Sequence, residues 1–351
     1  MVTPLQDPAD ITPQWLNGRL RENGHLPTGE VLRIEVGKTF KNRAGLFVAF
    51  KAVFSTPPPP ALYDTLILRF LPQDRLADTR LEIKFYQQFA SQLENPPVMR
   101  IYDYQANSTC GHLLMEDLSS THKENRNPRY SLEEYADLVE GLLKFHIHFW
   151  EHPQLKERSL RYHHGPLRLG IAATPSSIRT QCAQLQKKFT RFRKEHQGAI
   201  IDEHFDLCQR VIEAWPNLFI PRVQTGKGLT LLHGDYHFGN VFLPNPPLTR
   251  DVAILDWECA QSGIGTFDLA YLLVHSHHSQ QRRDFEHSLL KLYHNNLRYY
   301  GIEDYSWEEC LYDYQLGLLA TLFVPVHWNT PRAFKHPINA CHDWACHELL
   351  S

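Results

Sequence analysis

Residues 231–258 read LLHGDYHFGNVFLPNPPLTRDVAILDWE. An apolar run leads into His233-Gly234-Asp235, and Asn240 lies a few positions after that aspartate. A second apolar run, 252–255, ends at Asp256-Trp257-Glu258. Short apolar runs bounded by turn residues are typical of buried strands. The pattern therefore predicts two carboxylates and an amide at the ends of two short strands, which a proline-rich turn connects.

Three side chains of this stretch match the needs of phosphoryl transfer. That reaction uses one carboxylate to orient and deprotonate a hydroxyl, and an amide and a second carboxylate to hold Mg²⁺ on the nucleotide phosphates. The H-x-D-x-x-x-x-N spacing is that of the protein-kinase catalytic loop, and the later aspartate falls where the metal-binding D-F-G would lie. We therefore predict Asp235 as the catalytic base, and Asn240 and Asp256 as the metal ligands.

The combination of H-G-D-x-H-x-x-N, an apolar strand and D-W-E resembles the aminoglycoside phosphotransferase and choline kinase family. These are small-molecule kinases with a protein-kinase-like fold. The resemblance implies an α+β, two-lobed structure with a small β-rich N-terminal lobe and a larger, mainly helical C-terminal lobe. It also implies Mg²⁺-dependent transfer of the γ-phosphate of ATP, with GTP as the alternative donor, to a hydroxyl of a small molecule.

The same resemblance gives supporting roles to three further residues. His233 matches a histidine that supports the loop backbone, and His237 matches a position near the transferred phosphate. Asp268 lies in an apolar helix start that resembles the family segment whose aspartate braces the catalytic loop. A buried aspartate at a helix N-terminus can accept several backbone N–H groups, which suits a brace.

The composition and charge of the chain exclude several classes of binding partner. The net charge is −3 and 21% of the residues are charged, so no basic field is available for nucleic acid or an anionic membrane. No stretch approaches the roughly 18 apolar residues of a membrane span, and the polar N-terminus is unlike a signal peptide. Seven scattered cysteines indicate reduced thiols. We therefore expect a cytoplasmic protein whose partner is a small-molecule acceptor.

The order of expected elements changes from strands to helices along the chain. Thr12 is the expected cap of a helix that ends near Gly24. We predict an N-terminal nucleotide-binding lobe over 1–117 and a C-terminal lobe with the catalytic loop and acceptor site over 118–351. The first has strands at 31–36, 46–54, 65–70, 99–104 and 111–115, with a helix at 78–93. The second has helices at 131–150, 176–196, 267–275, 282–300 and 307–323.

Four residues of the first lobe are the expected nucleotide contacts. Arg69 stands where relatives usually carry a lysine, and Glu82 resembles the glutamate that pairs with it. Glu116 and Leu118 lie in a segment that resembles the family hinge, whose backbone meets the adenine edge. Lys51 is the alternative cation, on the preceding strand. The segment 37–45 is the expected phosphate-covering loop, although it lacks dense glycines.

Several alternatives remain open at this point. A catalytically silent kinase-like protein that binds a nucleotide or small ligand is favoured by Arg69 and by the glycine-poor loop. A protein kinase is disfavoured because no A-P-E segment follows Asp256. The aromatic residues of 145–150, Tyr312, Tyr314 and Trp328 fit either the acceptor side or the core.

A structural zinc site is the weaker alternative for the chain's Cys and His residues. The candidates are Cys341, His342, Cys346 and His347, with the pairs His146/His148 and His277/His278. Four convergent ligands, which such a site requires, are not evident in this spacing. An ordinary amphipathic helix explains the C-terminal residues better.

Overall fold

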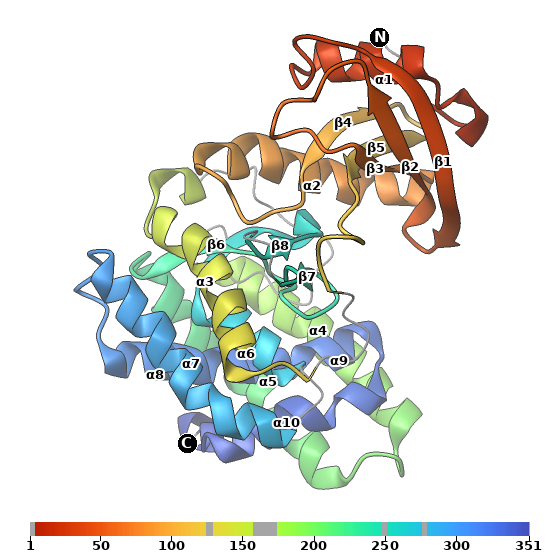
Figure 1. Ribbon diagram of the computed structural model, residues 1–351. Helices are drawn as coiled ribbons and strands as arrows, with labels where there is room; N and C mark the ends of the chain where they lie inside the picture. The colour runs from red at the N-terminus through yellow and green to blue at the C-terminus, as the bar shows by residue number, and fades with distance from the viewer. Residues whose placement is uncertain (1–3, 124–128, 157–173, 247–250, 276–278, 351) are drawn as a thin grey trace. The chain divides into compact units, whose positions relative to one another are not determined.

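The computed structural model describes residues 4–123, 129–156, 174–246, 251–275 and 279–350 (Figure 1). The chain forms two compact units. The small unit comprises 1–90, 98–124 and 244–249, and the large unit comprises 91–97, 125–243 and 250–351. The predicted lobe boundary between residues 117 and 118 lies within the second segment of the small unit.

The small unit is built on a five-stranded antiparallel sheet. Its strand order is β1-β2-β3-β5-β4. The strands are β1 (Val31–Asn42), β2 (Gly45–Phe54), β3 (Thr65–Leu71), β4 (Ile101–Ala106) and β5 (Gly111–Glu116). The five predicted strands are thus confirmed. The proline-rich segment after β2 is a connection, as expected for residues that cannot donate to a sheet ladder.

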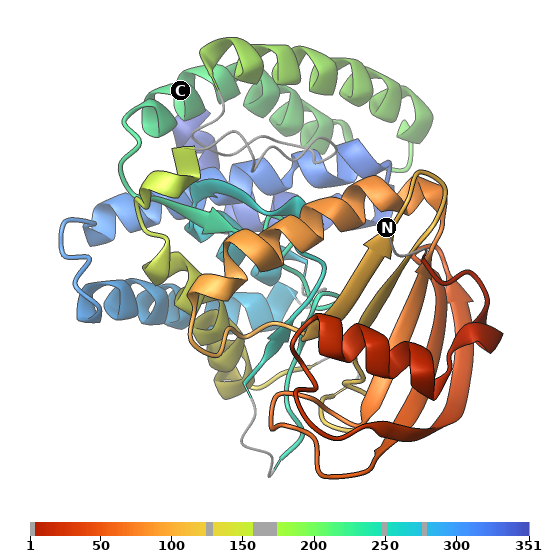
Figure 2. The same ribbon diagram turned by 90° about the horizontal axis from the view of Figure 1, so that it is seen from above.

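One face of this sheet is covered by the N-terminal helix α1, Pro13–Glu22 (Figure 2). Thr12 caps α1 by accepting the Trp15 amide at 3.2 Å. Alternate residues of a strand point to the same face. Leu66 and Leu68 of β3 accordingly share one core with Leu16 and Leu20 of α1. The opposite face of the same strand carries Arg69.

The β1–β2 hairpin corrects one expectation. Most of residues 37–45 lie in strand and not in an open loop, because β1 continues to Asn42 and pairs with β2 up to the partners Asn42 and Gly45. That this hairpin covers the phosphates stays a prediction. Only Arg43 and Ala44 lie between the two strands. The absence of clustered glycines lets the ladder continue, interrupted by a register shift between Val36 and Thr39.

A helix and short 3-10 turns complete the small unit's secondary structure. The helix α2 spans Leu76–Gln88, and the 3-10 turns are η1 (Pro8–Asp10), η2 (Gln73–Arg75) and η3 (Ala90–Gln92). The predicted helix at 78–93 is therefore real but ends earlier than expected. Its last residues, Ala90–Gln92, are in η3 instead.

The large unit is mainly helical. Ser131 and Glu134 form a reciprocal capping box at the start of α3. The helices are α3 (Leu132–His148), α4 (Pro175–His196), α5 (Asp202–Gln224), α6 (Thr266–Val274), α7 (Ser279–Tyr299), α8 (Trp307–Thr321), α9 (Phe323–Trp328) and α10 (Lys335–Asp343). The remaining turns are η4 (Pro153–Lys156), η6 (Trp257–Cys259), η7 (Pro331–Ala333) and η8 (Cys346–Leu350). The predicted α+β class is confirmed by this contrast with the strand-rich small unit.

Helix α5 is missing from the predicted elements. It contains Pro216 and Pro221 in its interior. Proline removes a helical hydrogen bond and normally marks a helix end. Here packing maintains the helix, because Trp215 and Phe219 are buried and stack on one another at 4.8 Å.

Helix α6 lies at the centre of the large unit. Every residue of Thr266–Val274 is buried, and the helix packs against α8. Two short strand pairs lie in the same unit: β6 (Leu229–Leu232) with β9 (Gln261–Ile264), and β7 (Val241–Phe242) with β8 (Ala253–Ile254). The polar residues predicted from 231–258 therefore lie at strand ends, as the sequence predicts.

Several aromatic residues proposed for the acceptor side belong to the core. Phe145, Phe149 and Tyr314 are fully buried, whereas Trp328 is exposed. Tyr314 also donates its hydroxyl to Glu286. These contacts favour the packing interpretation for Phe145, Phe149 and Tyr314.

The zinc alternative gains no support from the geometry. In the described ranges, no three Cys, His, Asp or Glu side chains are grouped closely enough to hold a metal ion. Cys341 and Cys346 are buried. The pair His277/His278 lies outside the described residues.

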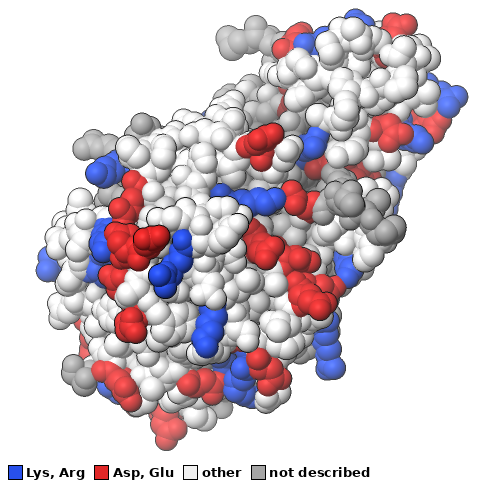
Figure 3. Space-filling view, turned by 60° about the vertical axis from the view of Figure 1, so that its left-hand side comes forward, with Lys and Arg blue, Asp and Glu red and all other residues white. Residues whose placement is uncertain are grey.

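Surface charge is mixed on the face drawn in Figure 3, where acidic and basic side chains are interspersed. This agrees with the small net charge of the sequence. None of the helices in the described parts of the chain combines the length and apolarity needed to cross a membrane. All seven cysteines are described, and none forms a disulfide.

Candidate functional site

A β-hairpin brings two of the predicted site residues together. Val241 of β7 pairs with Ile254 of β8, and the Leu255 amide donates to the Asn240 carbonyl at 2.8 Å. Asn240 therefore lies opposite Leu255 and beside its neighbour Asp256. The hairpin register explains why an amide and a carboxylate separated by a proline-rich turn belong to one site.

The loop that carries Asp235 begins at a glycine with a special backbone. Gly234 has φ of 82°, and a Cβ at this position would collide with the Cys259 carbonyl oxygen. Glycine alone fits both conditions. The tight turn directs the next residue, Asp235, away from the end of strand β6.

Asp268 holds the backbone of this turn. Its Oδ2 accepts the His233 amide at 2.6 Å, and its Oδ1 accepts the Gly234 amide at 2.9 Å. Asp268 is fully buried in the first turn of α6. Charge-assisted hydrogen bonds of this kind are stronger than neutral ones. The contacts are those that a brace requires.

His233 connects the loop to the strand that leads to Asp256. Its Nε2 donates to the Leu255 carbonyl at 2.7 Å, and its Nδ1 accepts the Asp235 amide at 3.2 Å. Both bonds require a neutral ring with the proton on Nε2. Burial lowers the pKa of His233 and so favours that neutral form.

The carboxylate of Asp235 is contacted at both oxygens. Tyr271 donates its hydroxyl to Oδ1 at 2.6 Å, and Asn240 donates its amide nitrogen to Oδ2 at 3.2 Å. His237 Nε2 lies 3.4 Å from the same Oδ2. The Asn240 amide nitrogen also donates to the Asp235 carbonyl at 3.0 Å, so its amide oxygen is the atom that remains for a metal ion.

These contacts keep Asp235 ionised. Burial opposes the charged form, but the hydrogen bonds from His237 and from the hydroxyl of Tyr271 outweigh it. The pKa of the Asp235 carboxyl is therefore held below its ordinary value. An ionised carboxylate can accept a hydrogen bond from a hydroxyl group.

His237 is positioned by its neighbour Gly239. The Gly239 amide donates to His237 Nδ1 at 2.9 Å, which assigns the ring proton to Nε2, the atom that faces Asp235. A Cβ at Gly239 would lie 2.7 Å from His237 Cε1. Only glycine leaves room for this ring orientation.

Asp256 has an uncommon backbone. Its φ and ψ are 61° and 54°, the left-handed region that Asp and Asn tolerate better than other side chains. Trp257, which follows it, is fully buried and contacts the rings of His233 and Phe145 at 4.6 Å each. Glu258 lies in the 3-10 turn η6, so it does not share a strand face with Asp256.

A second layer of buried polar groups lies behind Asp268. His146 of α3 places its Nε2 3.5 Å from Asp268 Oδ2, and its Nδ1 is 2.9 Å from the Tyr293 hydroxyl. The Thr230 hydroxyl donates to the His146 carbonyl at 2.7 Å. Residues of helices α3 and α7 thereby hold Asp268 in place, and Asp268 in turn holds the backbone of His233 and Gly234.

The family model of the phosphotransferase enzyme family matches residues 61–307. The chain belongs to this family. The matched range contains every residue of the geometry described above. The predicted family and the predicted enzyme class, a small-molecule kinase, are thereby confirmed. Comparison with curated protein sequences gave no significant match.

Solved structures similar to this phosphotransferase include three small-molecule kinases of low sequence identity. One is an aminoglycoside phosphotransferase from Streptomyces rimosus with ADP and streptomycin: 14% identity, 75% of this chain and 90% of that chain covered, TM-score 0.47. Another is a macrolide 2'-phosphotransferase from Brachybacterium faecium: 15% identity, 92% and 97% covered, TM-score 0.46. A third is a microcompartment-associated aminopropanol kinase: 12% identity, 93% and 95% covered, TM-score 0.45.

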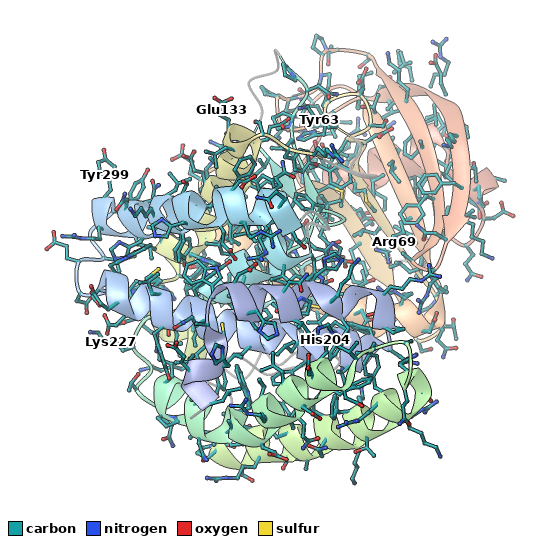
Figure 4. The ribbon with its side chains drawn as sticks, turned by 90° about the horizontal axis from the view of Figure 1, so that it is seen from below. Tyr63, Arg69, Glu133, His204, Lys227 and Tyr299 are labelled. Atoms are coloured by element: carbon teal, nitrogen blue, oxygen red, sulfur yellow. The ribbon has the colours of Figure 1, made fainter. Side chains whose placement is uncertain are left out.

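In the small unit of the phosphotransferase, Arg69 lies on the sheet (Figure 4). Its Nε donates to the Ala44 carbonyl at 2.9 Å, and its guanidinium lies 5.7 Å from the Phe47 ring centroid. Phe47 in turn stacks on Phe40 at 4.8 Å. These are the contacts of Arg69 among the described residues, and an ion pair with Glu82 is not one of them.

The other predicted nucleotide residues lie on separate elements of the small unit. Glu82 is buried in α2. Glu116, at the end of β5, accepts the Arg100 amide through its side chain at 2.9 Å. The Leu118 carbonyl accepts the amides of Thr121 at 3.0 Å and His122 at 2.9 Å.

The alternative cation Lys51 has a different environment. Its side chain is 54% exposed and lies 3.4 Å from Asp64. Arg69, by contrast, is buried. The environment of Lys51 is that of an ordinary surface ion pair.

Sequence reasoning missed three residues that shape the site of the phosphotransferase. They are Tyr271, which contacts Asp235, Gly239, which positions His237, and His146, which lies beside Asp268. The signal for Tyr271 was its position three residues after Asp268, since such residues lie on one helix face. His146 carried no comparable signal, because its contact depends on how α3 packs.

Proposed function

We propose that this phosphotransferase moves the γ-phosphate of ATP to a hydroxyl of a small molecule, with Asp235 as the base. GTP is the alternative donor, and we expect the reaction in the cytoplasm. The observation that carries the proposal is the contact of Asp235 with Asn240 on the hairpin that also leads to Asp256. One ionised carboxylate and two metal-type oxygen groups thus belong to one continuous piece of backbone.

In this mechanism Asp235 accepts the hydrogen bond of the acceptor hydroxyl and fixes its direction. The acceptor oxygen forms a bond to the γ-phosphorus, and the bond from that phosphorus to the β,γ-bridging oxygen breaks. The hydroxyl proton passes to the Asp235 carboxylate. Because such transfers need mainly positioning and charge stabilisation, the low pKa of Asp235 is compatible with the role.

Asn240 and Asp256 fit a magnesium ion. Mg²⁺ prefers oxygen ligands and commonly takes one or two from the protein. The Asn240 amide nitrogen donates to Asp235, so the amide oxygen is the potential ligand. When bound, the ion neutralises charge on the nucleotide phosphates.

Nucleotide binding is proposed for the small unit. Arg69 would supply a fixed positive charge to the phosphates, and Glu82 would support it from α2. The N–H of Leu118 and the backbone at Glu116 would meet the adenine edge. The existing bond from Arg69 to Ala44 does not consume its two terminal nitrogens, because Arg has five N–H donors.

The test is phosphoryl transfer by the purified protein with Mg²⁺ and ATP or GTP over a panel of hydroxylated acceptors. The panel should include streptomycin, a macrolide and aminopropanol, the compounds that appear in the names of the similar solved structures. It should also include choline and homoserine. Asp235→Ala should abolish acceptor-dependent transfer. Asp251→Ala is the matched control, since Asp251 is an exposed residue of the same region that pairs with Lys144 at 2.9 Å.

One observation favours a second candidate, a nucleotide-binding protein without transfer. Among the described residues, Arg69 contacts the Ala44 carbonyl and the Phe47 ring, and its guanidinium is an unusual substitute for the family's lysine. Nucleotide binding that does not depend on Mg²⁺, together with no transfer to any acceptor, would support that candidate. Transfer that disappears in Asp235→Ala would exclude it.

A further inference from the structure

Tyr271 connects helix α6 to the carboxylate of Asp235. It lies on α6 three positions after Asp268, so one buried helix contacts both the backbone and the carboxylate of the catalytic loop. The Tyr271 hydroxyl donates to Asp235 Oδ1 at 2.6 Å. This length is within the range of a charge-assisted O–H···O⁻ hydrogen bond.

The phenol can act only as a donor here. Burial and the charge of Asp235 raise the pKa of Tyr271 well above its ordinary value, so the hydroxyl keeps its proton at any physiological pH. Its ring is also fixed, because it lies 4.5 Å from the His275 ring and 6.2 Å from the His237 ring. A fixed ring presents the hydroxyl at one place.

The hydrogen bond from Tyr271 determines which acceptor directions of the Asp235 carboxylate are available to a substrate hydroxyl. Asn240 and His237 lie at Oδ2, whereas Tyr271 occupies one acceptor direction of Oδ1. A carboxylate offers about four acceptor directions. Contacts at both oxygens prevent the group from rotating, yet leave acceptor capacity for one more hydroxyl.

We infer that Tyr271 is a positioning residue, which holds the Asp235 carboxylate in the orientation that receives the acceptor hydroxyl. The inference rests on the proposed function of Asp235. It assigns to Tyr271 an effect on the transfer step and no effect on nucleotide binding, because its contact is with Asp235 alone among the proposed reacting groups. Misorientation of a reacting group by about 1 Å can cost about 100-fold in rate.

The first test replaces the hydroxyl and keeps the ring. Tyr271→Phe should lower kcat by about 10- to 100-fold, while the KM for the nucleotide stays within about twofold. Tyr271→Leu, which also removes the ring, should be hardly slower than Tyr271→Phe. If the residue only fills space, Tyr271→Phe will match the wild type and Tyr271→Leu alone will be impaired, which would overturn the inference.

A matched control is available elsewhere in the large unit. Tyr305 is also buried and donates its hydroxyl to a buried carboxylate, that of Asp313, at 2.9 Å. Tyr305→Phe removes the same type of bond without touching Asp235. Its kcat should equal that of the wild type at a temperature where both are folded. An equal kcat loss in both variants would attribute the effect to general destabilisation and overturn the inference.

A double-mutant comparison shows whether Tyr271 acts through Asp235. In an Asp235→Ala background, adding Tyr271→Phe should change neither the residual rate nor the melting temperature further. Additive losses would show that Tyr271 works independently of Asp235, against the inference. The melting temperatures need no acceptor, so the coupling is measured even if transfer is slow.

The experiments distinguish a failure of the proposed phosphotransfer reaction from a failure of the proposed role of Tyr271. A wild-type protein that transfers phosphate to no acceptor overturns the proposed function and the role of Tyr271 with it. An active wild type, inactive as Asp235→Ala but unchanged as Tyr271→Phe, overturns only the role of Tyr271.

Discussion

The carboxylate of Asp268 accepts the backbone amide of His233 at 2.6 Å, although the two residues lie 35 positions apart in the chain. The bond connects the loop that carries Asp235 to the first turn of the buried helix α6. The same carboxylate accepts the Gly234 amide, so both of its oxygens hold the loop. The loop's geometry therefore depends on a residue that is remote from the proposed chemistry.

Asp268→Asn should weaken both stability and transfer. An asparagine keeps one acceptor oxygen but places an NH₂ group against the other backbone amide. Leaving a buried donor unsatisfied costs about 1–3 kcal/mol, which should appear in the free energy of unfolding. Denaturant titration and kcat measurements check this. Asp284→Asn, at an exposed site on α7 that bonds Gln280, should leave both quantities unchanged.

Gly239→Ala should reduce transfer by displacing the His237 ring. The added Cβ would lie 2.7 Å from Cε1 of that ring, closer than such atoms approach. In a His237→Ala background the same substitution should have little further effect on kcat, because the clashing ring is gone. A full additional loss in that background would contradict the explanation and point to the loop backbone instead.

Arg69→Ala should weaken nucleotide binding, whereas Lys51→Ala should not. A charge-assisted hydrogen bond contributes about 1.5–3 kcal/mol, or about 10- to 100-fold in Kd. Lys51 is largely exposed and paired with Asp64, so its loss should change the Kd for ATP by less than about threefold. Calorimetric titration with ATP and Mg²⁺ compares the two variants. Equal Kd values would remove Arg69 from the nucleotide site.

Asp103 should make the small unit sensitive to acid. It is buried, and its carboxylate accepts two hydrogen bonds from Arg19, at 2.8 and 2.7 Å, and lies 2.9 Å from His112 Nε2. Burial alone would raise its pKa, but the bonds from His112 and Arg19 outweigh burial and hold the pKa below its ordinary value. Such a group stabilises the fold above its unfolded pKa of about 4, and this contribution is lost as the pH falls through the lower folded pKa.

Asp103→Asn should therefore lower the stability at neutral pH and flatten its decline below about pH 4. Breaking a buried ion pair on one side costs about 3–5 kcal/mol, because the buried Arg19 loses its buried partner and keeps only the more exposed Glu22. Lys144→Ala removes an exposed ion pair and should cost less than about 1 kcal/mol. The free energy of unfolding of the wild type and of Asp103→Asn, measured at several pH values, tests this prediction. An unchanged acid dependence in Asp103→Asn would contradict the assignment.

The sequence predicts the parts of the structure that depend on residues close together in the chain, such as helix caps and apolar runs. Thr12 and Ser131 begin their helices where capping chemistry places them. The strands β2 and β3 follow from their short, nearly continuous apolar runs. The grouping of Asn240 with Asp256 follows from the hairpin that their flanking strands form. In each case the responsible residues are near one another in the chain.

Features that depend on distant packing could not be predicted in this way. Helix α5 persists through Pro216 and Pro221 because buried aromatic residues hold it, which local propensity cannot show. The contact from Arg69 to Ala44 depends on how the β1–β2 hairpin closes. Likewise, Tyr271 contacts Asp235 only because α6 packs against the loop that carries Asp235.

The left-handed backbone of Asp256 restricts what mutation can do at this position. Glycine and asparagine suit that conformation, but neither carries the negative charge proposed for the metal site. Glutamate keeps the charge but has a longer side chain and no comparable tolerance of positive φ. A single substitution of Asp256 therefore removes its negative charge or strains its left-handed backbone. Asp256→Asn, which preserves the backbone, is consequently the route by which a descendant of this chain could lose catalysis and remain a well-folded binding protein.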